Sequence, residues 1–266
     1  MRRIYKEFMD EINAVKIGSG ELGIFWLGQN SFIIKMSTGG LIAIDPYFSR
    51  TPRFSYIHEK PPIRSEDLRV DFVFCTHDHL DHTDPDTLSR VAQHSSETIF
   101  VGTKESCDRF MNIGINPHRV KKVDANEAVA FEGFTVTSLH SIPPTESLKT
   151  THLGYVFDFG FVKAYNMGDS NMSVVDEPMT VLGEVAKHAP EIAMFPIIGD
   201  FRGRKPEDAY EFSKILHPKI IIPCHYGCFT DRTINPQIFA NLFEDTSDIK
   251  VVIIDYKGHY IYKSKG

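Results

Sequence analysis

The chain has 266 residues, 42% of them hydrophobic, and a formal net charge of −6 at pH 7. This length and apolar content are those of a globular protein with a sizeable core and argue against a disordered chain. The lysines and arginines are scattered rather than gathered into a stripe, which argues against a protein that binds the phosphate backbone of nucleic acid.

The N-terminal sequence MRRIYKEFMDEIN contains no apolar run of signal-peptide length, and no later segment approaches the roughly 20 apolar residues of a membrane span. The four cysteines are too few for a disulfide scaffold and lack the paired short spacings of a zinc ribbon. We therefore expect reduced cysteines, no membrane partner and a cytoplasmic protein. The amphipathic N-terminal segment could cover the core or mediate a homo-oligomeric contact.

The first elements in chain order are a helix and then strands. Ile4, Phe8 and Ile12 recur at helical spacing. Strands are predicted at 23–28, 30–36 and 41–47, and the Ser-Thr-Gly-Gly sequence at 37–40 predicts a hairpin turn. The nearly continuous apolar run at 70–76 is typical of a strand that is covered on both faces.

The rest of the chain alternates between strand-like and helical patterns. Helices are predicted at 178–188, 206–216 and 236–244, the last two with proline near the first turn. No linker or repeat interrupts the pattern, so we expect a single domain over residues 1–266. The predicted strands are 97–102, 134–141, 154–160, 161–170, 191–198, 219–227 and 250–256.

The sequence CTHDHLDHTD, at 75–84, places metal-ligand side chains directly after a predicted strand. In an extended turn, alternate side chains point the same way, so His77 and His79 could bind one ion while Asp81 and His82 face a second. Imidazole and carboxylate ligands without a thiolate suit Zn, Mn or Fe in an open site.

Three further strand ends carry ligand-type side chains. His140 ends FTVTSLH, Asp169 lies in NMGDS, and His225 ends KIIIPCH. Each residue alone could be a core histidine, a turn former or a surface residue. Their occurrence after the HxHxDH sequence makes a common metal site the favoured interpretation.

This combination resembles the metallo-β-lactamase-fold hydrolases and, more narrowly, their L-ascorbate-6-phosphate lactonase branch. The narrower resemblance lies in WLGQNSFIIK, IAIDPY, THDHLDHTD, VGTKESCDRFMNIGI, NMGDSNMS and IIPCHYG followed by NPQIF. It implies an α/β fold, a four-layer αββα sandwich, with a dinuclear metal site at one edge of the two sheets. This chain is more compact than the lactonases of that branch.

The resemblance also implies a ligand set. The first metal ion would be bound by His77, His79 and His140, with His152 of TTHLGY as an alternative third ligand. The second ion would be bound by Asp81, His82 and His225, and Asp169 would bridge the two ions.

Two such ions would make hydroxide available near neutral pH and polarise a substrate oxygen. Asp81 would orient the hydroxide. Asp81 and Asp169 are therefore the two catalytic candidates. Asp45 and Thr76 are candidates for fixing the imidazoles, with a turn or cap role as the alternative for each.

Candidate substrate contacts follow two strands. In GDFRGRK, Arg202 could bind a phosphate or carboxylate, because the resembling family has Arg-Gly at this place. Arg204 and Lys205 could do the same or be surface charges. Tyr226 could donate a hydrogen bond to an oxyanion or pack as an aromatic residue.

The function expected from these observations is a dinuclear metal-dependent hydrolase, with Zn or Mn favoured over Fe. Its substrate would be a small anionic, sugar-derived lactone or ester such as L-ascorbate 6-phosphate. The alternatives are a phosphodiesterase that acts on a small phosphodiester and a non-catalytic metal-binding protein of the same fold.

Overall fold

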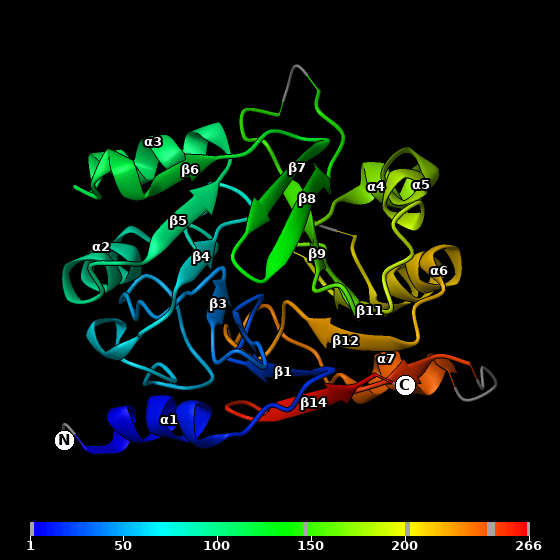
Figure 1. The fold of residues 1–266 in the computed structure, drawn as a ribbon. Coiled ribbons are helices and arrows are strands. Elements are labelled where there is room, and N and C mark those ends of the chain that lie inside the picture. Colours follow the sequence, from blue (N-terminus) through cyan, green and yellow to red (C-terminus); the bar gives the residue numbers. More distant parts are fainter. Residues whose placement is uncertain (1–2, 146–147, 200–202, 244–247, 265–266) are drawn as a thin grey trace. The chain divides into compact units, whose positions relative to one another are not determined.

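The computed structural model describes residues 3–145, 148–199, 203–243 and 248–264 (Figure 1). Contacts within the chain divide it into two compact units. The first unit comprises Met1–Val123 with Ile254–Gly266, and the second comprises Asp124–Ile253. Each unit is built on its own seven-stranded sheet. The single domain expected over residues 1–266 stays a prediction.

The sheet of the first unit has the strand order β14-β1-β2-β3-β4-β5-β6. Its strands are β1 (Glu21–Trp26), β2 (Phe32–Lys35), β3 (Leu41–Ile44), β4 (Phe72–Phe74), β5 (Ile99–Gly102), β6 (Val120–Lys122) and β14 (His259–Lys263). Its helices are α1 (Arg3–Ala14), α2 (Pro85–His94) and α3 (Lys104–Asn112), with 3₁₀ turns at Ser65–Asp67 and Pro117–Arg119.

The strand directions of the first unit bring several loops to one edge of its sheet. β2 is antiparallel to both β1 and β3, and β3, β4 and β5 are parallel neighbours. The turn after β1 therefore lies at the same edge as the loops after β3 and β4. The hairpin predicted at 37–40 is confirmed, because Met36 N–H donates to the Gly40 carbonyl at 2.9 Å between β2 and β3.

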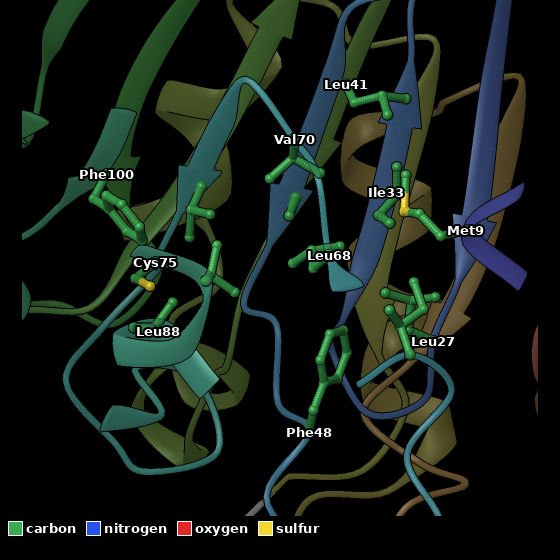
Figure 2. Close-up of a cluster of buried hydrophobic side chains, with 14 of the residues drawn as sticks. Met9, Leu27, Ile33, Leu41, Phe48, Leu68, Val70, Cys75, Leu88 and Phe100 are labelled. Atoms are coloured by element: carbon green, nitrogen blue, oxygen red, sulfur yellow. The ribbon is translucent and has the colours of Figure 1, made fainter. Parts of the chain in front are cut away.

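The core of the first unit lies between its sheet and its helices (Figure 2). Met9 of α1 packs in the same buried cluster as Ile33 of β2, and Leu88 of α2 packs there with Cys75. Of the residues whose spacing predicted the N-terminal helix, Phe8 is 2% exposed and Ile12 is fully buried.

We expect Lys35→Met to loosen α1. Lys35 is buried, and its Nζ donates to the carbonyls of Ile12, Asn13 and Val15 at 2.8–2.9 Å, so one cation satisfies carbonyls at the end of the helix. Burial lowers the pKa of Lys35. Losing hydrogen bonds from a charged group should lower the free energy of unfolding by about 1.5–3 kcal/mol.

Chemical denaturation followed by circular dichroism would measure this loss. Lys16→Met is the matched control, because Lys16 is exposed two residues after the end of α1. Equal stability of the two variants would contradict a capping role for Lys35.

The sheet of the second unit has the strand order β13-β12-β11-β10-β9-β8-β7. Its strands are β7 (Glu127–Phe131), β8 (Phe134–His140), β9 (Leu153–Asp158), β10 (Lys163–Asn166), β11 (Ile192–Pro196), β12 (Ile220–Cys224) and β13 (Lys250–Val251). Its helices are α4 (Met172–Asp176), α5 (Met179–Ala186), α6 (Pro206–Leu216) and α7 (Gln237–Ala240), followed by a 3₁₀ turn at Asn241–Phe243. α5 and α6 lie side by side (Figure 1).

The second sheet also gathers its loops at one edge. β9 is antiparallel to β8 and to β10, whereas β10, β11 and β12 are parallel neighbours. The carboxyl ends of β8, β10 and β12 and the start of β9 therefore share an edge. Within the described ranges, every helix is too short or too polar to cross a bilayer.

The sequence prediction of individual elements was uneven. Most predicted strands are confirmed, and α6 has the predicted bounds. The predicted helix at 236–244 is a single α-helical turn followed by a 3₁₀ turn, and the predicted strand at 250–256 is reduced to Lys250–Val251. The prediction missed six elements: α2, α3, α4, β6, β7 and β14.

Candidate functional site

In the first unit, the loop after β4 brings its histidines together. His77 Nε2 lies 2.9 Å from His79 Nδ1, and the rings of His77 and His82 have centroids 3.9 Å apart. His82 Nε2 lies 3.6 Å from Asp81 Oδ2. His77, Asp81 and His82 are buried, while His79 is half-buried. This short segment therefore concentrates imidazole nitrogens and a carboxylate within reach of a cation.

The backbone of this loop is fixed by a turn and by Thr83. The N–H groups of His82 and Thr83 both donate to the His79 carbonyl, at 3.1 and 2.7 Å. The Thr83 hydroxyl donates to the His77 carbonyl at 2.7 Å. These bonds fold the loop back on itself, so that His77 contacts His82 as well as His79. An extended turn would separate the pair His77 and His79 from the pair Asp81 and His82. In the folded loop the two pairs lie closer together than that, because His77 also contacts His82.

The other two aspartates of CTHDHLDHTD have structural partners. Asp78 accepts from Arg109 of α3 through both carboxylate oxygens, at 2.5 and 2.7 Å. Asp84 caps α2 by accepting from the Asp86 N–H, and it also accepts from Ser49 and Thr87. Of the three aspartates, Asp81 is thus the one placed beside His82.

Asp45 and Thr76 meet at the edge where the loops after β3 and β4 lie together. Asp45 is fully buried and accepts from the Thr76 N–H and hydroxyl, both at 2.7 Å. Its Oδ2 lies 2.6 Å from His82 Nδ1. Because a carboxylate accepts, His82 Nδ1 carries the proton, and its Nε2 is the nitrogen with the lone pair that a metal ion needs.

Cys75 precedes this loop but is not a ligand candidate. It lies in the core of the first unit with no exposed surface. Burial, aided by the nearby Asp45, raises the pKa of its thiol well above the usual range, which disfavours the thiolate that a metal ion would need. All four cysteines of the chain are buried.

In the second unit, Asp169 and His225 follow the carboxyl ends of β10 and β12. Both are buried, and His225 Nε2 lies 4.0 Å from Asp169 Oδ1. Gly168 has a φ of +72°, which lets the chain turn directly before Asp169, and the Ser170 N–H donates to Asp169 Oδ1 at 2.7 Å. The two residues are therefore neighbours at one edge of this sheet, as their positions at strand ends predict.

His140 and His152 lie at the same edge of the second sheet. The Ser141 N–H donates to the His152 carbonyl at 3.1 Å, next to the pairing of His140 with Leu153. His140 Nδ1 is buried without a hydrogen-bond partner among the described residues, and burial lowers the pKa of this histidine. His152 is 1% exposed. The second unit thus offers both histidines as ligand candidates.

The candidate substrate residues have different positions. Arg202 lies outside the described residues. Arg204 is not the surface charge of one alternative: it is buried, and its guanidinium donates to Asp208 at 2.6 Å and to Ser170 Oγ at 2.9 Å. Lys205 is exposed, and Tyr226 is buried at 5% exposure.

Two amide side chains at the first site were missed by the sequence analysis. Gln29 donates to Asp81 Oδ2 at 3.0 Å, and Asn30 donates to Asp45 Oδ2 at 2.7 Å. Neither residue is charged or a common metal ligand, so the sequence alone does not separate them from turn residues. The sequence could have indicated them in one way, because they are two polar residues between two largely apolar predicted strands.

Comparison with known proteins agrees with this fold. A family model described as "Beta-lactamase superfamily domain" matches residues 23–225. A UPF0173 metal-dependent hydrolase of Methanosphaera stadtmanae is 30% identical over 228 residues, which cover 84% of this chain and 91% of that protein. Another, from Methanosarcina mazei, is 28% identical over 250 residues, covering 88% and 96%.

Solved structures share the fold. A metallo hydrolase named Igni18, from Ignicoccus hospitalis, superimposes with a TM-score of 0.69 at 19% identity and covers 91% of this chain and 99% of its own. An isothiocyanate hydrolase from gut bacteria of Delia radicum gives a TM-score of 0.70 at 17% identity, with coverage of 91% and 99%. The predicted metallo-β-lactamase fold class is confirmed. The chain belongs to the beta-lactamase superfamily and is related to the UPF0173 metal-dependent hydrolases.

Proposed function

We propose that this metal-dependent hydrolase opens a lactone or similar carboxylic ester of a small anionic, sugar-derived compound, such as L-ascorbate 6-phosphate, in the cytoplasm. The site would hold two divalent ions. The proposed ligands are His77, His79, Asp81, His82, His140, Asp169 and His225. His152 is the alternative to His140, and Zn or Mn suits this nitrogen and oxygen ligand set better than Fe.

The observation that supports the proposal most directly is the contact of Asp45 with His82. A histidine that binds a metal ion usually donates its second ring N–H to a carboxylate or carbonyl, which fixes its orientation. Asp45 Oδ2 lies 2.6 Å from His82 Nδ1, and Asp81 lies on the Nε2 side of the same ring at 3.6 Å.

The second unit supplies independent support. A buried carboxylate is costly unless it is paired with positive charge, and Asp169 is fully buried with His225 Nε2 4.0 Å away. His140 Nδ1 is a buried ring nitrogen without a hydrogen-bond partner among the described residues. Both features suit residues that bind a cation.

When bound, two divalent ions would lower the pKa of water toward neutrality and polarise a carbonyl or phosphoryl oxygen. In this proposal Asp81 accepts a hydrogen bond from the attacking water and thereby orients it. Asp169 would be a further metal ligand, Arg202 would bind the anionic group of the substrate, and Tyr226 would donate a hydrogen bond to the oxyanion.

The test has two parts. Protein purified without chelator is first analysed for metal, and about two ions of Zn or Mn per chain are expected for a dinuclear hydrolase. Turnover of a panel of lactones and esters that includes L-ascorbate 6-phosphate is then compared with turnover of bis(p-nitrophenyl) phosphate.

Hydrolysis confined to the phosphodiester would overturn the lactonase proposal in favour of a phosphodiesterase. Failure to retain or take up Zn or Mn would refute the proposed metal site, whereas metal uptake without turnover of any substrate in the panel would support the non-catalytic metal-binding alternative. The two failures are distinguishable because metal uptake is measured before any substrate is added.

A further inference from the structure

We infer that Gln29 and Asn30 are positioning residues of the metal site in the first unit. Each side-chain amide holds one of the two carboxylates that flank His82. The inference rests on the proposed function, because it concerns the binding of the metal ions that the function needs.

The two amides lie in a tight turn between β1 and β2. The Leu27 N–H donates to the Ser31 carbonyl at 2.8 Å, and the Ser31 N–H donates to the Gly28 carbonyl at 2.9 Å. The Trp26 indole N–H donates to the Gln29 carbonyl at 3.0 Å. The backbone that carries the two amides is therefore held at three points.

Gln29 has a φ of +53°, in the left-handed region. Glycine, asparagine and aspartate adopt this region much more readily than a residue with a longer side chain. A glutamine in this conformation needs a compensating contact, and its long side chain supplies one by reaching Asp81, 52 residues along the chain.

The amides are buried and directed at two different carboxylates. Gln29 is 1% exposed and Asn30 is fully buried. The amide nitrogen of Gln29 donates to Asp81 Oδ2 at 3.0 Å, and that of Asn30 donates to Asp45 Oδ2 at 2.7 Å. Since an ionised carboxylate can only accept, the NH₂ group of each amide must face it.

Ser31 ties the same turn to the loop after β3. Its hydroxyl donates to the Asp45 carbonyl at 2.5 Å and accepts from the Tyr47 N–H at 3.1 Å. Asp45 is thus held at its carbonyl by Ser31 and at its carboxylate by Asn30. Three consecutive side chains of one turn therefore hold the residues around His82.

The consequence for metal binding follows from the freedom of a carboxylate. The terminal torsion of an aspartate is broad, so its oxygens rotate unless donors fix them. Asn30 fixes the oxygen that also contacts His82 Nδ1 at 2.6 Å, and Gln29 fixes the Asp81 oxygen that lies 3.6 Å from His82 Nε2. The turn therefore fixes the carboxylate oxygens on both sides of the His82 imidazole before a metal ion binds.

Two near-isosteric variants without donors, Gln29→Met and Asn30→Leu, test the inference. The full-length protein is stripped with a chelator and titrated with Zn²⁺ against a chromophoric competitor, so that affinity is read without any enzymatic assay. Each variant should bind Zn²⁺ about 10- to 100-fold more weakly than the wild type, the usual effect of removing a residue that orients a metal ligand.

Gln93→Met is the matched control, because Gln93 is an exposed amide on α2 of the same unit. The melting temperature of each metal-free protein is recorded to separate folding from binding. Weaker Zn²⁺ binding in both turn variants, with the control unchanged, supports the inference. Wild-type affinity in both turn variants overturns it.

Gln29→Asn covers the case in which a turn variant does not fold. It keeps an amide and the left-handed backbone preference but is one methylene shorter, so it does not reach Asp81. Normal Zn²⁺ binding by this variant overturns the role of the Gln29 contact, and weakened binding supports it. If the wild-type protein takes up no Zn²⁺, the proposed function itself is refuted. That result differs from equal Zn²⁺ binding by wild type and variants, which refutes only the inference about the two amides.

Discussion

Replacing Asp81 by alanine is expected to remove hydrolytic activity and leave the fold intact. Asp81 lies 3.6 Å from His82 Nε2, whereas Asp78 of the same loop pairs with Arg109 and Asp84 caps α2. The variant would lose both a metal ligand and the acceptor that orients water. We expect turnover to fall by at least about 10³-fold, since a single electrostatic contact to a reacting group already contributes 10²–10³.

Turnover of the substrate found in the panel, measured with excess Zn²⁺ or Mn²⁺, would check this result. Asp86→Ala is the matched control, because Asp86 is an exposed carboxylate five residues further along the chain. Circular dichroism of both variants would establish that they fold. Unchanged turnover in Asp81→Ala would refute both the proposed mechanism and the ligand role of this residue.

The second large effect is expected on stability, from Arg204→Met. The Arg204 side chain is fully buried and donates to Asp208 at 2.6 Å, to Ser170 Oγ at 2.9 Å and to the Pro196 carbonyl at 3.0 Å. Burial lowers the pKa of Arg204, and the Asp208 carboxylate opposes this effect. Removing the Arg204 guanidinium leaves the buried Asp208 carboxylate without its cationic partner. We therefore expect the free energy of unfolding to fall by about 3–5 kcal/mol.

Denaturation of the metal-free protein would measure the loss, and two comparisons interpret it. Arg204→Met combined with Asp208→Leu should recover part of the stability, because no charge is then left buried without a partner. Lys187→Met breaks the exposed ion pair with Glu184 and should change stability little. Equal losses in Arg204→Met and Lys187→Met would contradict the buried-pair explanation.

Arg204 also shows why a charged residue near a predicted site is hard to interpret from sequence. GDFRGRK offers three cations after a strand, and nothing local distinguishes a substrate contact from a core residue. The distinction depends on Asp208, in the first turn of α6, and on Phe212, whose ring centroid lies 5.2 Å from the guanidinium carbon. Arg204 has a structural role because it is buried against Asp208 and Phe212.

Elements with strong apolar runs were predictable. β11 and β12 are buried along their whole length, and their sequences are apolar almost throughout, as expected for parallel strands covered on both faces. β14 and β7 were missed because their residues are largely polar or half-exposed and they form the outer strands of their sheets. An outer strand forms because a neighbour offers hydrogen bonds, and its own sequence shows this poorly.

The sequence alone determined the chemical character of the candidate site. The spacing of His77, His79, Asp81 and His82 places imidazoles and a carboxylate on one short loop, and strand ends predicted the places of Asp169 and His225. These are local properties, because a short loop and the end of a strand keep their residues together in any fold that forms the strand.

The tertiary structure decided which residues hold that site in place. Asp45 meets His82 across 37 residues of sequence, and Gln29 meets Asp81 across 52. These pairs form because the turn after β1 and the loops after β3 and β4 end at one edge of the first sheet, where buried carboxylates require donors. Strand order and burial set such contacts, and a pattern of residues along the chain does not specify either.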